Sequence, residues 1–333
     1  MVRQPKARAL QDRYDSVYMT PDSKKSSSAK SRAWQIAACL LIVYIVWGTT
    51  YFAIKVAIEE IAPFFMVGTR YLAAGIVLLG WQLLRGKPMP TAKQWRGAAV
   101  VGFLLLVVGN GGVAVAEHTV SSGATVALIS IMPLATVLWA GAFGDWPGRA
   151  EWIAIALGGV GVAIMLLGRD LQGSIFGTLI ILFAAASWSL GTVLSRKLDI
   201  PHGPTGFGAE MFAAGAIGMV VSAGLGEHWM VPKIPHVWLA WGYLVVFGSV
   251  IAFSAFRFVV ERVSASLAST YAYVNPPVAL IVGWWLGHET FSANVLVGLP
   301  VVLIAVALHA WIQTRAQNSP APISPVPGVV TRP

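Results

Sequence analysis

Ten stretches of about 20 predominantly apolar residues follow one another along this chain of 333 residues, and they constrain its fold more than any other feature. A helix of that length crosses the hydrocarbon core of a bilayer, and within lipid each segment must satisfy its own backbone hydrogen bonds. The stretches show no period-2 alternation. We therefore predict an all-α integral membrane protein with ten transmembrane helices. The expected helices are residues 34–56, 63–84, 96–116, 121–143, 151–168, 174–195, 207–225, 237–258, 265–286 and 293–313.

The scarcity of charge supports a surface that faces lipid. Only 11% of the residues are charged, whereas a soluble globular domain carries about 25%. The net charge of +9 could suggest a nucleic-acid partner, but the basic residues lie between the apolar stretches and near the chain ends. We therefore expect membrane lipid, and no nucleic acid, as a partner.

The sequence also argues against cofactor chemistry. Cys39 is the single cysteine, so neither a disulfide framework nor a thiolate cluster can form. The pair His288-Glu289 begins like a zinc-protease motif, but Ser292 stands where the second histidine would be needed. The Gly80, Gly86-Lys87 spacing does not match a phosphate-binding loop. We predict no metal, no cofactor and no catalytic residue.

Two polar ends flank the apolar part of the chain. Residues 1–33 are basic and serine-rich, and residues 315–333 are proline-rich, so both are expected to be disordered tails. Between them we expect two five-helix halves, residues 34–168 and 169–314. The first apolar stretch is too long for a cleaved signal peptide and is interpreted as a signal anchor.

The distribution of lysine and arginine predicts the orientation. With the N-terminus in the cytoplasm and ten alternating helices, nearly all of the 23 basic residues fall on the cytoplasmic side. The exceptions are Lys55, Arg70, Arg169 and Lys233. By the positive-inside rule both termini lie in the cytoplasm, and the location is a bacterial-type inner (plasma) membrane. Nine or eleven helices would spoil this pattern.

The two halves share an internal pattern. Residues of helices 1, 2 and 4 recur in helices 6, 7 and 9 at offsets of about 140 residues, as expected for repeated transporter halves. Because five is an odd number, the second copy would enter the membrane inverted. The matched sets are Trp47 and Lys55 with Trp188 and Arg196; Arg70-Tyr71-Leu72-Ala73-Ala74-Gly75 with Glu210-Met211-Phe212-Ala213-Ala214-Gly215; and Ser121, Pro133 and Gly144 with Ser264, Pro276 and Gly287.

Several of these segments resemble the EamA family of the drug/metabolite transporter superfamily. The similar segments are Trp47-Gly48-Thr49-Thr50-Tyr51-Phe52-Ala53-Ile54-Lys55, Arg70-Tyr71-Leu72-Ala73-Ala74, Ile131-Met132-Pro133-Leu134, and Asn275-Pro276-Pro277-Val278 running to Leu286-Gly287-His288-Glu289. Asp145-Trp146 departs from the family pattern, which has Glu after the Gly. The resemblance implies a 5+5 inverted-topology repeat and export of amino acids, other metabolites or drugs. It also implies a central cavity between helices 1–4 and 6–9, with helices 5 and 10 at the periphery.

Polar and aromatic residues in the middle of the spans predict where a substrate binds. Aromatic rings stack on apolar substrates, although tryptophan and tyrosine also mark membrane interfaces. Asn110 lies among three glycines, which allow either a bend toward a cavity or close packing. The predicted substrate-binding residues are Trp47, Thr50, Tyr51, Asn110, Trp188, Tyr271 and Asn275.

Three ionisable residues and three prolines complete the predicted site. Arg70, Glu117 and Glu210 are candidates for gating or coupling, because charged groups in spans usually face the protein interior. The alternatives are a structural Arg70–Glu210 ion pair, snorkelling, and an ordinary interfacial loop at Glu117. Proline removes a backbone donor, and the matched helix breaks expected at Pro133 and at Pro276 and Pro277 indicate a site near the membrane midplane.

Together these features predict a secondary transporter that exports a small amphipathic metabolite or drug by alternating access. Its substrate gradient or a coupled proton would drive it, with Glu117 and Glu210 as the carboxylates able to carry the proton. An importer and an uncoupled facilitator are alternatives, and a membrane-embedded lipid-modifying enzyme is a remote one. A monomer and a homodimer both fit the small-residue patterns on the helices.

Overall fold

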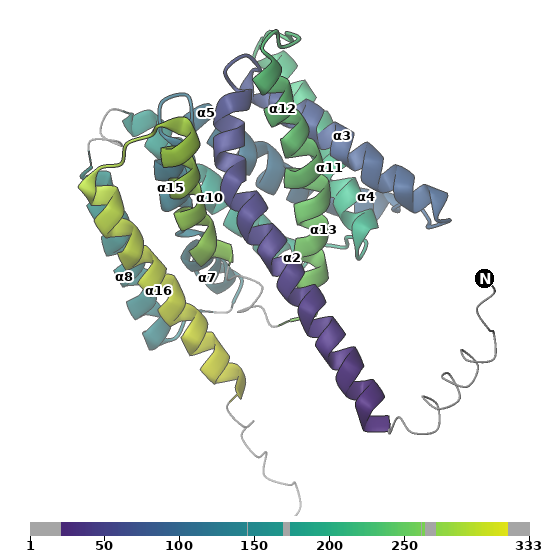
Figure 1. The fold of residues 1–333 in the computed structure, drawn as a ribbon, viewed down its shortest axis with the longest axis vertical. Helices are drawn as coiled ribbons and strands as arrows, with labels where there is room; N and C mark the ends of the chain where they lie inside the picture. Colours follow the sequence, from purple (N-terminus) through teal and green to yellow (C-terminus); the bar gives the residue numbers. More distant parts are fainter. Residues whose placement is uncertain (1–20, 145, 169–173, 261, 264–270, 319–333) are drawn as a thin grey trace, which may run out of the picture.

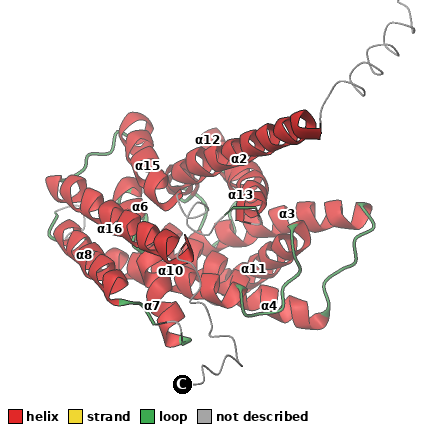
Figure 2. Ribbon diagram, turned by 90° about the horizontal axis from the view of Figure 1, so that it is seen from below, coloured by secondary structure: helices red, strands yellow, loops and turns green. Residues whose placement is uncertain are grey.

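A computed structural model describes residues 21–144, 146–168, 174–260, 262–263 and 271–318. Within these residues the secondary structure is helical throughout, and Figure 2 shows a bundle of helices joined by short loops. Among the described residues, nine helices are long and apolar enough to cross a membrane, and Val274–Gly287 forms a shorter apolar helix. The prediction of an all-α membrane protein of about ten spans is confirmed.

Apart from the start of the first helix and the end of the last, the spans lie within a few residues of the expected ranges. In chain order they are α2 (Pro21–Ala57); α3 (Pro63–Leu84); α4 (Ala92–Gly102), η1 (Phe103–Asn110) and α5 (Gly111–Ala116); α6 (Ser122–Ile129) and α7 (Met132–Ala142); α8 (Arg149–Leu166); α10 (Ile175–Ser195); α11 (Pro204–Gly224); α12 (Pro235–Tyr243), η2 (Leu244–Ile251) and α13 (Ala252–Val260); α15 (Tyr271–Gly287); and α16 (Ala293–Asn318). Residues 264–270, the expected start of the ninth helix, lie outside the described residues.

Two helix ends differ from the expected boundaries. Helix α2 begins at Pro21, within the segment expected to be a disordered tail, and proline is favoured in the first turn of a helix. Helix α16 continues to Asn318, past the expected limit at residue 313. Figure 1 shows that α2 begins and α16 ends on the same side of the bundle. We call this side the terminal face and the other side the opposite face.

Three spans have interrupted or altered helical geometry. The third and eighth spans each contain a π-helix, η1 and η2, in the middle of the membrane segment. The fourth span is interrupted at Ser130 and Ile131, directly before Pro133 in the first turn of α7. The break expected at Pro276 and Pro277 is absent, because α15 continues through both prolines. That prediction was wrong: the helix continues through both positions, although each proline leaves the carbonyl four residues earlier without a backbone donor.

The two halves of the chain pack across one another. Helix α3 of the first half lies along α11 of the second, and α8 lies along α16 at the edge of the bundle (Figures 1 and 2). Glycines allow the first of these contacts. A Cβ on Gly75 would stand 2.5 Å from the backbone nitrogen of Phe212, and a Cβ on Gly215 would meet the backbone nitrogen of Leu72. Close helix approach through small residues is typical of membrane interfaces.

Candidate functional site

A cavity lies in the bundle between the two halves, and its empty space, part of it open to solvent, is about 590 Å³. Its walls come from the first four spans and from the sixth, eighth and ninth, while α8 and α16 pack together away from it. The lining residues are Trp47, Thr50, Tyr51, Ile54, Arg70, Gly109, Asn110, Val113, Ile129, Met132, Ala184, Ala185, Trp188, Phe253, Tyr271 and Asn275. The structure thus brings together all seven residues predicted to bind substrate. Their binding role remains a prediction.

Aromatic rings form one wall of the cavity. The ring of Trp47 lies 5.0 Å from that of Phe253, 4.9 Å from that of Phe256 and 5.2 Å from that of Tyr271, measured between centroids. The indole nitrogen of Trp47 donates to the carbonyl of Gly248 in η2 at 3.3 Å. Edge-to-face contacts and this hydrogen bond hold the rings in fixed orientations. The wall is therefore a mostly apolar surface on which the Trp47 indole nitrogen already has a hydrogen-bond partner.

The two π-helices supply polar groups to the interior. A π-helix pairs residues five apart, and each of these two carries a side chain that donates to a carbonyl five residues earlier. Asn110 donates to Leu105 at 3.4 Å, and Ser249 donates to Leu244 at 3.0 Å. Asn110 lines the cavity directly. The glycines beside Asn110 serve packing, since a Cβ on Gly109 would stand 3.0 Å from the ring of Trp188.

Other polar side chains in the wall are tied to nearby carbonyls. Thr50 donates to the carbonyl of Trp47 at 2.7 Å. With its amide nitrogen turned toward two carbonyls, Asn275 donates to Tyr271 at 3.2 Å and to Tyr44 at 3.3 Å. Because these side chains already donate to carbonyls, a ligand would find mainly their oxygen atoms available as hydrogen-bond acceptors. The surface between them is mostly apolar.

The interruption of the fourth span opens onto the same cavity. Met132, the first residue of α7, lines the cavity, and its carbonyl accepts a hydrogen bond from Ser189 of α10 at 3.0 Å. The Ser189 hydroxyl thus joins α10 to the first turn of α7. Pro276 and Pro277 adjoin Asn275 of the lining without breaking their helix.

Arg70 and Glu210 do not form the ion pair that was one interpretation of their matched positions. Arg70 is 2% exposed and donates from Nε to Ser249 of η2 at 2.9 Å. Glu210 lies on α11, where Arg257 is close enough to interact with its carboxylate. Although α3 and α11 pack along each other, the two side chains have different partners: Arg70 contacts Ser249 of η2, and Glu210 interacts with Arg257 of α13. Of the two, only Arg70 lines the cavity.

Glu117 lies just beyond the third span, on the opposite face. Its side chain is fully buried, and neither carboxylate oxygen has a hydrogen-bond partner. Lys55 donates to the backbone carbonyl of Glu117 and, at 3.5 Å, to that of Val120, and so leaves the carboxylate itself unpaired. Burial raises the pKa of Glu117 well above its ordinary value, the Lys55 charge opposes this, and the Glu289 charge adds to it. The interpretation of Glu117 as an ordinary interfacial loop residue does not fit this burial.

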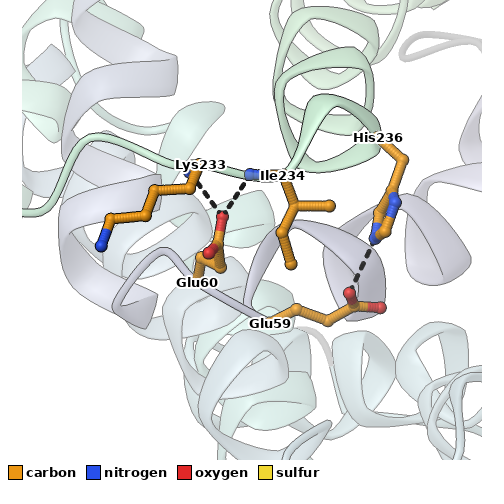
Figure 3. Close-up of polar contacts among 5 residues, drawn as sticks. All are labelled: Glu59, Glu60, Lys233, Ile234 and His236. Carbon is orange, nitrogen blue, oxygen red and sulfur yellow. Dashed lines mark hydrogen bonds and ion pairs between the residues drawn. The ribbon is translucent and has the colours of Figure 1, made fainter.

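Carboxylates from one half cap helices of the other half on the opposite face. Glu60, just after α2, accepts hydrogen bonds from the backbone nitrogens of Lys233 (2.8 Å) and Ile234 (2.9 Å) before α12, as Figure 3 shows. Next to it, Glu59 pairs with His236 at 2.9 Å (Figure 3). A carboxylate is stabilised at a helix N-terminus by free N–H groups and the helix dipole.

Two further caps follow the same rule. Glu227, after α11, accepts from the backbone nitrogens of Phe64 (3.1 Å) and Phe65 (2.8 Å) at the start of α3. Glu289, after α15, accepts from the backbone nitrogen (3.0 Å) and hydroxyl (2.9 Å) of Ser122 at the start of α6. Sequence reasoning missed all three caps. An acidic residue in a short loop was visible, but not the helix it would reach.

Ser249 and Phe253 are site residues that sequence reasoning also missed. Ser249 is a small hydroxyl in an apolar run, and Phe253 is one of many phenylalanines in the spans. Only tertiary packing distinguishes them from neighbours that face lipid. Among the described residues, no group of three His, Cys, Asp or Glu side chains is arranged to hold a metal ion.

Comparisons with known proteins give a consistent result. The sequence model of the EamA-like transporter family matches residues 34–167 and again residues 175–311. The uncharacterized inner membrane transporter YedA of Escherichia coli K12 is 41% identical over 270 residues, 81% of this chain and 88% of that protein. The uncharacterized transporter YoaV of Bacillus subtilis 168 is 25% identical over 83% of this chain and 97% of that protein. A solved crystal structure superposes with a TM-score of 0.61 at 19% identity, over 85% of this chain and 98% of that one, which indicates a shared fold.

Proposed function

Because the chain belongs to the EamA-like transporter family, we propose that it is a secondary transporter that moves a small amphipathic metabolite or drug through the cavity between its two halves. The observation that carries the proposal is the cavity itself. Aromatic rings, amides and one buried cation converge on it from seven spans. Concave, mostly apolar sites with a few placed polar groups are typical of small-molecule binding.

The proposed mechanism is alternating access, with the two halves moving against each other around the cavity. Three glutamate caps and the Glu59–His236 contact join the halves on the opposite face. Exposure of the cavity on that face requires these contacts to release. The matched patterns of the two halves favour the inverted repeat on which such motion depends.

We place both termini in the cytoplasm and the protein in the inner (plasma) membrane. The basic residues concentrate on the terminal face, as the positive-inside rule requires of a cytoplasmic surface. The relative YedA is named as an inner membrane transporter. On this placement the three caps and Glu117 lie on the outer side, and the direction that we propose for transport is export.

Glu117 is our candidate for proton coupling. A carboxylic acid held neutral by burial releases its proton when water reaches it, because hydration restores its ordinary pKa. On closure of the opposite face, Glu117 would take up a proton from the outer side. Coupling to export then requires that water entering through the cavity release this proton toward the cytoplasm when the terminal face opens. Lys55, which contacts the same turn, would help to drive the release. Glu210 is the second candidate.

Transport assays with purified protein in liposomes test the proposal. A screen of cells that overexpress the gene, comparing amino acids, nucleosides and cationic drugs, would first supply a transported compound. We then expect flux of that compound to rise when a proton gradient drives protons across the membrane in the opposite direction. Glu117→Gln should abolish this rise. Asp199→Asn, which removes an exposed carboxylate on the terminal face, is the control. A flux indifferent to the gradient would favour the facilitator, and accumulation only in the inward direction would favour the importer.

A further inference from the structure

The cavity contains a buried cation that the protein itself does not neutralise. Arg70 reaches the cavity from α3, and its guanidinium carbon lies 4.7 Å from the centre of the Tyr71 ring. Its Nε donates to Ser249, but its Nη1 is buried without a hydrogen-bond partner. No carboxylate among the described residues is within ion-pair distance of Arg70. The site therefore holds an uncompensated positive charge and an unused donor.

Its neighbours position the guanidinium rather than neutralise it. The Ser249 hydroxyl accepts from Arg70 and donates to Leu244, so both of its roles are used. Gly248 provides the space, since a Cβ there would stand 3.1 Å from Arg70 Nη2 and 3.1 Å from the Thr50 methyl carbon. The carbonyl of Gly248 also accepts from Trp47. These contacts fix the arginine at the junction of α2, α3 and η2.

A buried guanidinium without a partner is costly, because arginine keeps its charge in proteins and a desolvated charge needs a counter-charge. Functional sites are where proteins retain such a cost, and a ligand that supplies the counter-charge would remove it. A carboxylate is the chemical group that matches the fork of N–H donors on arginine.

The rest of the lining is uncharged. Among the described residues it contains no aspartate or glutamate, and it consists of aromatic rings, amides, hydroxyls and aliphatic side chains. Aromatic faces alone could attract a cation, but Arg70 would repel a cation in the same cavity. The aromatic residues of the lining, among them Trp47 and Trp188, suit the apolar body of a ligand whose charged end contacts Arg70.

We propose that the cavity binds small organic acids, with the ligand carboxylate on Arg70 and an aromatic or aliphatic body against the Trp47 wall. The proposal rests on the proposed transport function and names the substrate class of the same cavity. It separates organic acids from the cationic drugs and neutral nucleosides that the fold alone would admit. Arg70 is then the residue that determines specificity.

Three probes of similar shape test the charge preference: 3-phenylpropionate, 3-phenylpropanamide and 3-phenylpropylamine. Binding to the purified full-length protein in detergent is measured by isothermal titration calorimetry. We expect the carboxylate to bind at least about tenfold more tightly than the amide, which corresponds to about 1.4 kcal/mol, and the amine to show no binding. Equal binding of the amide or the amine, or no binding of the carboxylate, would overturn the proposal.

Variants assign the preference to Arg70. Arg70→Gln is expected to remove the difference between carboxylate and amide, and Arg70→Lys to keep part of it, because a point charge remains without the fork. Arg85→Gln is the matched control, since Arg85 is exposed at the end of the same helix, over the Trp81 ring. If Arg70 were merely structural, Arg70→Gln would lower the melting temperature yet leave the ratio of the two affinities unchanged.

Flux measurements separate this proposal from the transport function on which it rests. Liposomes containing the protein are loaded with 3-phenylpropionate or with a cationic dye. Flux of the dye without flux or binding of the carboxylate would refute the organic-acid proposal and leave the transporter in place. Binding of the carboxylate that Arg70→Gln abolishes, with no flux of either compound, would support the site and contradict the transport function.

Discussion

Substitution of a single glycine tests how closely the two halves of the chain approach each other. In Gly75→Ala the new methyl carbon would stand 2.5 Å from the backbone nitrogen and 2.7 Å from the Cα of Phe212 in α11. Ordinary contacts of a Cβ begin near 3.4 Å. Because both obstructing atoms belong to the backbone, no side-chain rotation relieves the clash, and α3 must move away from α11 by most of an ångström.

The expected cost follows from two opposing terms. Overpacking of a tight interface costs about 1–3 kcal/mol, while replacement of glycine by alanine inside a helix contributes about 1 kcal/mol of helix propensity. Gly80→Ala on the same helix isolates the second term, since a Cβ there has nothing within 4 Å. The two variants should therefore differ by about 1–3 kcal/mol in free energy of unfolding, with Gly75→Ala the less stable.

Reversible unfolding of the purified protein in mixed micelles, followed by circular dichroism, measures this difference. Combining Gly75→Ala with Phe212→Ala should not restore stability, because the closest atoms of Phe212 are in its backbone. Equal stability of the Gly75 and Gly80 variants would refute the close packing described for α3 and α11. Full rescue by the double variant would show that a side chain, and not the backbone, limits the approach.

Three further expectations concern the cavity and the opposite face. Asn110→Ala and Tyr271→Ala should each lower flux without changing the melting temperature, and unchanged flux in both would remove them from the site. The folded protein should lose stability as pH rises above about 4.3, the ordinary glutamate pKa. The reason is that the folded state retains on Glu117 a proton that the unfolded chain releases. The free energy of unfolding should therefore fall less steeply with pH in Glu117→Gln than in the unchanged protein. Glu227→Gln should destabilise the protein by about 0.5–2 kcal/mol through the start of α3, more than Glu59→Gln, whose contact is exposed, and the reverse order in melting experiments would contradict the capping role.

Local chemistry made the spans and much of the cavity predictable. The length of each apolar run is set by the bilayer, so the span limits could be read from hydropathy. Residues such as Asn110, Tyr271 and Asn275 could be identified because polar groups in mid-span are costly in contact with lipid and usually face the protein interior. The structure places them at one cavity. The interruption near Pro133 follows from the missing donor of proline.

Features that depend on register or on distant partners could not be predicted in this way. The residues of η1 and η2 are as apolar as those of an ordinary helix, so nothing in them signals a π-helix. Pro276 resembles Pro133 in sequence, yet its helix continues through it. The contact of Arg70 with Ser249 depends on which spans are adjacent, and symmetry of the two halves suggested Glu210 instead.

The crossed packing of the halves has a consequence for how the protein is made. Helix α3 completes its contacts only with α11, and α8 only with α16, the last of the described spans. The start of α3 is likewise capped by Glu227, which is synthesised about 160 residues later. The first five spans therefore enter the membrane with these packing surfaces exposed to lipid until the second half has been inserted. Assembly of this protein is a late event in its synthesis, and a chain that ends before α16 leaves α8 without its partner.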